Sequence, residues 1–246
     1  MQHRSKKIKK SFFIILVVLI VLSGGSAIYL GNYYHSVDVE KYMNGSSEVS
    51  VEKFDKGWFF DGAGEEKTLI FYPGAKVATE AYAPLMYQLA ESGIDCFLVD
   101  MPFHMAFFGM NRAEEIMQEY NYEAWYLGGH SLGGAMAANF AADYVEDHTD
   151  GIRGLLLLAA YPTKDLSTSD MSVVTVYGSE DGVLNMDKIV AGRELMPQDY
   201  KEVCVEGGNH AQFGSYGAQR GDGTAAIPAE EQGARTVEVF VGDESE

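Results

Sequence analysis

One stretch, residues 122–142, restricts the possible folds of this chain more than any other. It reads Tyr-Glu-Ala-Trp-Tyr-Leu-Gly-Gly-His-Ser-Leu-Gly-Gly-Ala-Met-Ala-Ala-Asn-Phe-Ala-Ala. The aromatic residues near its start favour a strand, and the alanine-rich run at its end favours a helix. Ser131 stands between the two. The stretch therefore predicts a strand that turns sharply into a helix with a serine at the turn.

This serine lies in a G-x-S-x-G pentapeptide, Gly129-His130-Ser131-Leu132-Gly133. Such a serine sits in a strained turn, where side chains two positions before and after it would collide with the neighbouring strand and helix. A glycine-rich turn without chemistry is the alternative interpretation, because a short pattern also arises by chance. The position between a strand and a helix favours a nucleophilic serine.

Charge and hydropathy set the first 47 residues apart from the rest. Residues 1–10 are basic, and residues 11–30 form a nearly continuous apolar run that is long enough to span the ~30 Å core of a bilayer. We predict a cytoplasmic segment at 1–10, a transmembrane anchor at 11–30, a juxtamembrane tether at 31–47 and an extracytoplasmic domain at 48–246. A cleaved signal peptide, which would make the protein secreted, is the alternative to the anchor.

Composition narrows the class of the remaining domain. The chain has 246 residues, 47% of them hydrophobic, and a net charge of −18, which suits one large core and argues against nucleic acid as a partner. Cys96 and Cys204 lie in apolar, strand-like runs, and we expect both to be buried free thiols. Because no His/Cys cluster has the spacing of metal ligands, we expect no metal and no cofactor.

Hydrophobic patterning along the domain alternates between strands and helices. An opening antiparallel hairpin is expected at 48–60, followed by strands near 68–72, 94–99, 125–127, 152–159, 173–177 and 201–205. Helices are expected at 81–92, 112–120, 132–147, 187–195 and 229–241. This alternation predicts an α/β fold with a mainly parallel twisted sheet flanked by helices, in which ligands bind beyond the carboxyl ends of the strands.

A nucleophilic serine needs a base, and the base needs an acid to orient it. His210 follows the last expected strand, among glycines, and is our candidate base; His104 is the alternative. Asp181 follows the strand at 173–177 in a glycine-flanked turn and is our candidate acid. Asp165 is the competing carboxylate, and we interpret Glu180 as a surface charge.

The chain resembles the α/β-hydrolase superfamily through four motifs: Tyr-Pro-Gly-Ala-Lys-Val at 72–77, Gly-His-Ser-Leu-Gly-Gly-Ala-Met-Ala at 129–137, Tyr-Gly-Ser-Glu-Asp-Gly-Val at 177–183 and Gly-Gly-Asn-His-Ala-Gln-Phe-Gly at 207–214. They look like a membrane-anchored or secreted bacterial branch related to dienelactone-hydrolase-like proteins, although those enzymes carry a cysteine nucleophile. The resemblance implies a catalytic triad in the order Ser131, Asp181, His210. It also implies an oxyanion hole formed by the backbone N–H groups of Leu132 and Ala75, with Lys76 as the alternative to Ala75.

Many relatives insert a lid where this chain has only the short connection 161–171, so we expect an open site with a minimal lid. The aromatic and methionine-rich loop 101–110 either lines an apolar substrate pocket or fills the core. Candidate pocket residues are Lys76, Phe103, His104 and Tyr161.

We therefore expect a serine hydrolase that cleaves a small-molecule ester, thioester or related acyl substrate. An acyltransferase or a peptidase on the same triad, and a catalytically silent binding module on the same fold, are the alternatives. The tripeptide Arg220-Gly221-Asp222 matches an adhesion motif, but a match of three residues is expected by chance.

Overall fold

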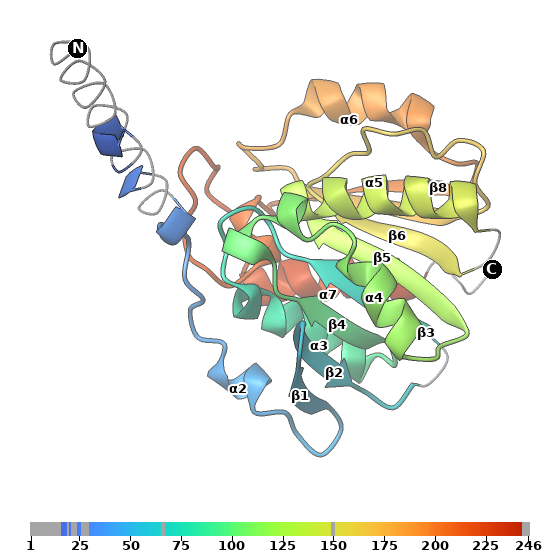
Figure 1. Cartoon of the computed structure of the whole chain (residues 1–246), viewed down its shortest axis with the longest axis horizontal. Helices are drawn as coiled ribbons and strands as arrows, with labels where there is room; N and C mark the ends of the chain where they lie inside the picture. The colour runs from blue at the N-terminus through green and yellow to red at the C-terminus, as the bar shows by residue number, and fades with distance from the viewer. Residues whose placement is uncertain are drawn as a thin grey trace, which may run out of the picture. The chain divides into compact units, whose positions relative to one another are not determined.

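The computed structural model describes residues 16–18, 20, 24–25, 30–64, 67–148 and 151–242. The chain divides into two compact units, residues 1–33 and 34–246. In the first unit, the described residues 16–18, 20, 24–25 and 30–31 are helical. The second unit contains the sheet and the helices labelled α2 to α7 (Figure 1).

The predicted membrane anchor is largely untested by the structure. The basic segment 1–10 and most of residues 11–30 lie outside the described residues. Within the described part of the chain, no helix is both long enough and apolar enough to cross a bilayer. The anchor and the extracytoplasmic location of the domain therefore stay predictions.

The described strands form one eight-stranded sheet in the order β1-β2-β4-β3-β5-β6-β7-β8. The two opening strands pair antiparallel with their neighbours, and the other six strands are parallel to one another. This arrangement confirms the predicted mainly parallel sheet with an opening hairpin. The strands are β1 (Ser50–Phe54), β2 (Gly57–Asp61), β3 (Lys67–Tyr72), β4 (Asp95–Val99), β5 (Ala124–His130), β6 (Ile152–Leu158), β7 (Ser172–Gly178) and β8 (Tyr200–Val205).

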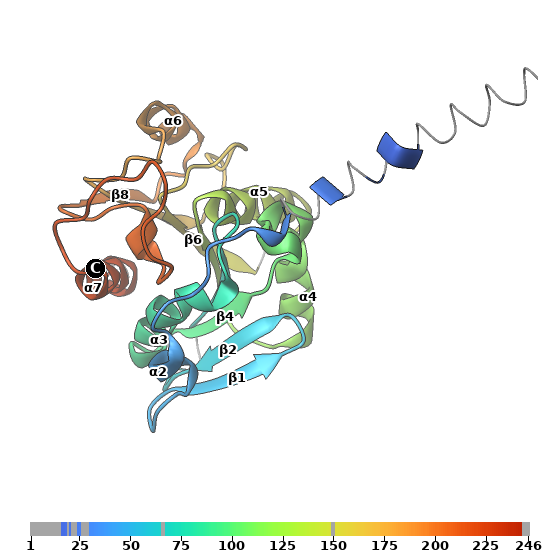
Figure 2. The same ribbon diagram turned by 90° about the vertical axis from the view of Figure 1, so that its left-hand side faces the viewer.

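Helices cover both faces of the sheet. Figure 2 shows α3 (Ala83–Glu91) and α7 (Ala229–Gly242) on one side, and α4 (Arg112–Glu119) and α5 (Leu132–Asp147) on the other. The central strand β3 alternates between the two layers: Leu69 and Phe71 belong to the cluster under α3 and α7, whereas Ile70 and Tyr72 belong to the cluster under α4 and α5. Burying each such side chain stabilises the fold by about 1.5–3 kcal/mol.

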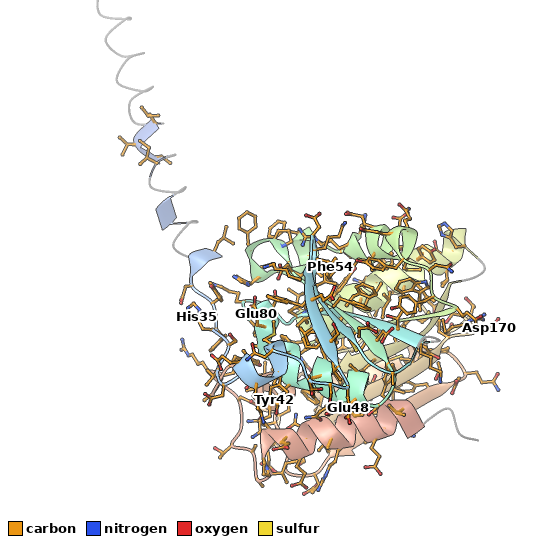
Figure 3. All side chains as sticks on the ribbon, turned by 90° about the horizontal axis from the view of Figure 1, so that it is seen from below. His35, Tyr42, Glu48, Phe54, Glu80 and Asp170 are labelled. Carbon is orange, nitrogen blue, oxygen red and sulfur yellow. The ribbon has the colours of Figure 1, made fainter. Side chains whose placement is uncertain are left out.

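Residues 34–47, expected as part of a tether, pack against the domain. The Tyr34 N–H donates to the carbonyl oxygen of Lys76 at 2.7 Å, and Val39 is buried. Helix α2 (Glu40–Met43) carries Tyr42 (Figure 3). The ring of Tyr42 meets that of Tyr87 edge-on, with 5.5 Å between the ring centroids. The folded unit therefore begins before the expected boundary at residue 48. Because apolar and polar residues are mixed in this stretch, the sequence pattern did not indicate that its apolar side chains are buried.

The remaining helices are short. Helix α6 (Met186–Gly192) continues into the 3-10 turn η4 (Arg193–Leu195), close to the expected helix at 187–195. Further 3-10 turns are η1 (Thr79–Tyr82), η2 (Pro102–His104), η3 (Ala106–Phe108) and η5 (Ala211–Phe213). The connection between β6 and β7, described throughout, carries no helix. This is the minimal lid that the sequence predicts.

The two cysteines differ in exposure. Both are free thiols; Cys96 is buried on β4, whereas Cys204 is exposed on β8. The expectation that Cys204 is buried was therefore wrong. The physical reason is the strand order, because β8 lies at the edge of the sheet and its alternate side chains are not covered on both faces.

Candidate active site

Ser131 occupies a strained turn between β5 and α5. Its backbone has φ 53° and ψ −122°, a conformation that costs a residue with a side chain about 1–3 kcal/mol. Gly133 makes the turn sterically possible, because a Cβ there would lie 2.1 Å from the carbonyl oxygen of Tyr72. A Cβ on Gly129 would lie 2.6 Å from the carbonyl carbon of Gly133. The structure thus shows why the pentapeptide needs both glycines, and its geometry is that of a nucleophile elbow.

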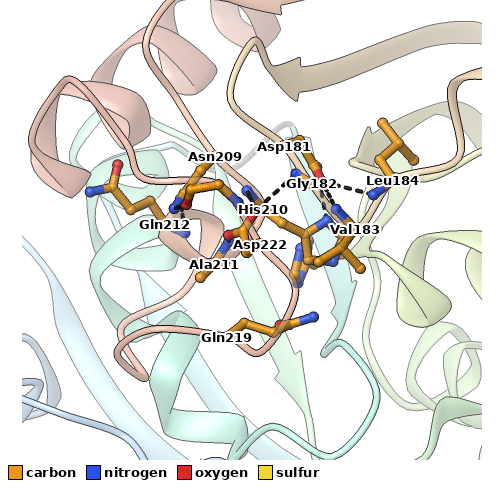
Figure 4. A network of polar contacts seen from close by, with 12 residues as sticks. Asp181, Gly182, Val183, Leu184, Asn209, His210, Ala211, Gln212, Gln219 and Asp222 are labelled. Atoms are coloured by element: carbon orange, nitrogen blue, oxygen red, sulfur yellow. Dashed lines mark hydrogen bonds and ion pairs between the residues drawn. The ribbon is translucent and has the colours of Figure 1, made fainter.

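Asp181 and His210 lie together beyond the carboxyl ends of β7 and β8. Asp181 Oδ2 is 2.8 Å from His210 Nδ1, and both side chains are only 2% exposed. The other carboxylate oxygen, Oδ1, accepts the N–H groups of Val183 at 2.9 Å and Leu184 at 2.8 Å (Figure 4). These two bonds fix the rotamer of Asp181, so the carboxylate is held with one oxygen toward the imidazole.

This pairing determines which nitrogen of His210 is available. A carboxylate only accepts hydrogen bonds, so His210 carries its proton on Nδ1 and presents a lone pair on Nε2. The ring of His130, the residue before Ser131, lies 4.4 Å from the ring of His210 between centroids. The elbow and the Asp181–His210 pair therefore lie at the same edge of the sheet. Among the described residues, the Ser131 hydroxyl makes no hydrogen bond to His210; such bonds commonly tighten only when substrate binds.

A second carboxylate, Asp222, ties the acid loop to the base loop. Its oxygens accept the N–H groups of His210 at 3.2 Å, Ala211 at 2.8 Å and Gly182 at 3.1 Å (Figure 4). One side chain thus holds the residue after Asp181 and the backbone of His210 itself. The sequence shows only an aspartate in a glycine-rich loop, which gives no indication of this role. Asp222 was noted there only as part of the tripeptide that matches an adhesion motif.

The Ala75 N–H group, in the backbone after β3, is available for an oxyanion. The Gly74 N–H donates to the hydroxyl of Tyr82 at 3.0 Å, and the Lys76 N–H donates to the carbonyl oxygen of His104 at 2.7 Å. Within the part of the chain that the structure describes, the Ala75 N–H between them donates to no hydrogen bond. The first N–H group of α5, on Leu132, likewise lacks an intrahelical acceptor. These are the two donors that the resemblance implies.

The competing candidates lie elsewhere. Asp165 is exposed and accepts the N–H of Ser167 at 2.9 Å. Hydrogen bonding from the Ser167 side chain, and then from its N–H, lowers the pKa of the Asp165 carboxyl. Glu180 is exposed as well. His104 lies in η2, where partial burial lowers the pKa of its imidazole, and its carbonyl supports Lys76. The carboxylate that the structure places beside His210 is therefore Asp181.

The loop 101–110 forms an aromatic surface at this edge of the sheet. Phe103, Phe107 and Phe108 are 56%, 66% and 53% exposed. The centroid of the Phe108 ring lies 5.6 Å from that of Phe103 and 5.3 Å from that of Phe107. The turn η3 packs against α5, the helix that follows Ser131. The loop thus fills the core only in part and leaves these three rings to solvent.

The other two pocket candidates are half-buried. Lys76 has φ 58° and is held through its N–H, and Tyr161 follows β6 and packs beside Gly192 of α6. Within the described ranges, no group of three or more His, Cys, Asp or Glu side chains could hold a metal ion.

A separate cavity of about 220 Å³ lies between α2, α3, η5 and α7. Gln212 and Phe213, which closely follow His210, contribute to its wall. None of Ser131, Asp181 and His210 lines it. The candidate active site is therefore distinct from this cavity and lies at the open carboxyl edge of the sheet.

A parallel sheet with a strained serine at a strand-to-helix turn, and a buried aspartate–histidine pair at the same edge, defines an α/β protein of the hydrolase type. Residues 68–234 match the model described as the alpha/beta hydrolase family. The chain belongs to this family.

Solved structures are similar in fold. A hydrolase from Agrobacterium vitis S4 matches with a TM-score of 0.58 and 14% identity over 79% of this chain and 98% of its own. Carboxyl esterase 2 from Tuber melanosporum matches with a TM-score of 0.59 and 13% identity over 85% and 89%. A carboxylesterase from Bacillus subtilis matches with a TM-score of 0.53 and 8% identity over 83% and 96%. No curated protein matches the sequence. The narrower resemblance to dienelactone-hydrolase-like proteins stays a prediction.

Proposed function

We propose that this chain is a serine hydrolase that cleaves an ester, thioester or related acyl substrate through an acyl-enzyme on Ser131. The observation that carries the proposal is the buried Asp181–His210 hydrogen bond, at the edge of the sheet where Ser131 occupies its strained turn. Esterases among the similar structures support it. The roles of Ser131, Asp181 and His210 in the reaction follow from their positions.

In the first half-reaction, the proton of the Ser131 hydroxyl passes to Nε2 of His210 while the serine oxygen attacks the acyl carbonyl carbon. The carbonyl electron pair moves to its oxygen, which receives the N–H groups of Leu132 and Ala75. Two such donors typically contribute about 3–4 kcal/mol each to the transition state. When the intermediate collapses, the leaving group takes the proton from Nε2, and Asp181 stabilises the imidazolium in between.

In the second half-reaction, water gives a proton to Nε2 and attacks the acyl-enzyme. The ester bond to Ser131 breaks, the serine oxygen recovers its proton, and the carboxylic acid leaves. All groups needed for both steps belong to the chain and to water.

The exposed rings of the 101–110 loop favour an apolar acyl or aryl group in the substrate. Three phenylalanines at this edge, each more than half exposed, offer a surface that an acyl chain of several carbons would bury, at about 0.8 kcal/mol for each buried CH₂. A short acetyl group gains little from this surface. We therefore expect activity to rise with chain length up to a limit.

Fluorophosphonate labelling of the purified full-length chain, followed by p-nitrophenyl esters from acetate to decanoate, tests this function. The expected result is labelling that is lost in Ser131→Ala, and a preference for medium chains that is weakened in Phe108→Ala. Undiminished labelling in Ser131→Ala would place the nucleophile elsewhere, and a preference for acetate would refute the apolar pocket.

We also propose that residues 11–30 anchor the protein in the cell membrane with the domain outside the cytoplasm. The lysine-rich segment before an apolar run of sufficient length supports this orientation. Protease added to intact cells should then digest the domain. A domain that is protected until the membrane is broken would refute the orientation.

A further inference from the structure

Two buried residues outside the triad connect the oxyanion loop to the base. Tyr82 ends η1 and is fully buried, and His130 ends β5 and is 1% exposed. The Tyr82 hydroxyl accepts the Gly74 N–H at 3.0 Å and lies 2.8 Å from His130 Nδ1. His130 in turn packs its ring against that of His210.

The protonation states of the pair follow from their burial. Burial raises the pKa of the Tyr82 phenol well above its ordinary value. Burial, and then the neighbouring His210, lower the pKa of the His130 imidazole well below its ordinary value. Both groups are therefore neutral near pH 7. The oxygen of Tyr82 accepts from the Gly74 N–H, and its hydroxyl lies within hydrogen-bonding distance of His130 Nδ1, where the imidazole tautomer decides which group donates.

Gly74 packs closely against both Tyr82 and His130. A Cβ at this position would lie 2.8 Å from the Tyr82 hydroxyl and 2.8 Å from His130 Nδ1. Only glycine lets the backbone come this close to both groups. The peptide before Ala75 is thus fixed by a hydrogen bond on one side and by close packing on the other.

We propose that Tyr82 and His130 form a positioning pair, in which Tyr82 aims the Ala75 N–H at the oxyanion and His130 supports the ring of His210. This inference rests on the proposed serine hydrolase function. In the part of the chain that the structure describes, neither side chain forms a hydrogen bond with Ser131, Leu132 or Ala75. The pair acts by holding the loop and the base in the geometry that the transition state requires, and a misplacement of about 1 Å in such a site costs about 10²-fold in rate.

Tyr82→Phe tests the pair, because it removes one oxygen and keeps the ring. We expect kcat on a p-nitrophenyl ester to fall about 10- to 100-fold, with KM changed less than about 3-fold, because an oxyanion donor acts mainly in the transition state. Affinity for a trifluoromethyl ketone, which forms a tetrahedral adduct with the serine, should fall by the same factor. Tyr87→Phe on α3 is the matched control and should behave like wild type.

A double-mutant cycle with Gly74→Ala gives a second, independent measure. Gly74→Ala should lower kcat strongly in the wild-type background and less in the Tyr82→Phe background, because the hydroxyl that the new methyl group strikes is already absent. Near-ultraviolet circular dichroism checks that each variant is folded. If Tyr82→Phe does not fold, the kcat and ketone affinity of His130→Asn decide in its place, and both should fall.

The outcomes separate this inference from the proposed function. If wild type shows no Ser131-dependent labelling and no turnover, the proposed function is wrong and this inference with it. If wild type turns over ester and Tyr82→Phe keeps the same kcat and ketone affinity, only the positioning pair is refuted. Equal effects of Gly74→Ala in both backgrounds would refute the coupling between Tyr82 and Gly74.

Discussion

Replacing Asp181 with asparagine should abolish nearly all turnover while the fold is retained. In the structure, Oδ1 of Asp181 accepts the N–H groups of Val183 and Leu184, and Oδ2 faces His210 Nδ1 at 2.8 Å. An asparagine whose oxygen stays on the two N–H groups turns its NH₂ toward His210. The imidazole must then accept at Nδ1 and carry its proton on Nε2, which removes the lone pair that takes the serine proton.

The magnitude follows from this change of tautomer. In a serine protease triad, the same replacement costs about 10⁴ in kcat, or about 5.4 kcal/mol in activation free energy. Stability should change far less, because both turn hydrogen bonds survive. One charge-assisted hydrogen bond, worth about 1.5–3 kcal/mol, is lost, but the cost of burying a charge is removed as well. We expect the free energy of unfolding to change by less than about 2 kcal/mol.

The assay is kcat on any ester that wild type hydrolyses, with urea unfolding of each variant. Asp165→Asn is the control, because Asp165 is exposed and its carboxylate contacts Ser167; its kcat should stay within about twofold of wild type. Retention of more than a tenth of the wild-type kcat by folded Asp181→Asn, or a large loss in Asp165→Asn, would refute the assignment of the acid.

Three further predictions follow from other described residues. Because burial holds the pKa of the His130 imidazole well below its ordinary value, its stabilising contribution is present above pH 6.5 and is lost as pH falls. Urea unfolding at pH 7.5 and at pH 5.5 should therefore show that wild type loses more stability on acidification than His130→Gln. Asp222→Asn presents an NH₂ group to the Ala211 N–H, so it should destabilise the fold by about 1–3 kcal/mol and lower kcat; an unchanged melting temperature and kcat would contradict the clamp. With a disulfide reagent, native protein should show one reactive thiol, Cys204, and denatured protein should show two. Because burial and nearby glutamates raise the pKa of the Cys204 thiol, its reaction should be slow at pH 7 and faster at higher pH. A second reactive thiol in native protein would count against a buried Cys96.

The elbow and the Asp181–His210 pair were accessible from the sequence for two physical reasons. The elbow is local, since Gly129 and Gly133 make room for one another and for β3 within a single turn. Asp181 and His210 are far apart in sequence, but each follows a parallel strand, and the carboxyl ends of parallel strands meet at one edge. Pattern and topology together were enough to bring these residues together.

Tyr82, His130 and Asp222 could not be found in this way. Tyr82 lies in a stretch with an apolar helical pattern, and this pattern gives no reason to single out its hydroxyl. The hydroxyl meets His130, 48 residues away in sequence, only through tertiary packing. Asp222 is one of many acidic residues, and its contacts depend on how a glycine-rich loop closes. Exposure of Cys204 depends on the order of the strands, which hydrophobic patterning does not contain.

The distribution of backbone strain explains why these hidden contacts gather at one edge of the sheet. Of the non-glycine residues described with positive φ, Lys76, Phe103, His104 and Ser131 all follow the carboxyl ends of β3, β4 and β5. Such a conformation persists only where its surroundings over-determine it, and here the surroundings are visible. The Lys76 N–H donates to the carbonyl oxygen of His104, so two strained residues on separate loops hold one another. Hydrogen bonds on both sides of the Ala75 peptide therefore hold the strained backbone at this edge in place. A site held in this way does not have to reorganise when an oxyanion forms.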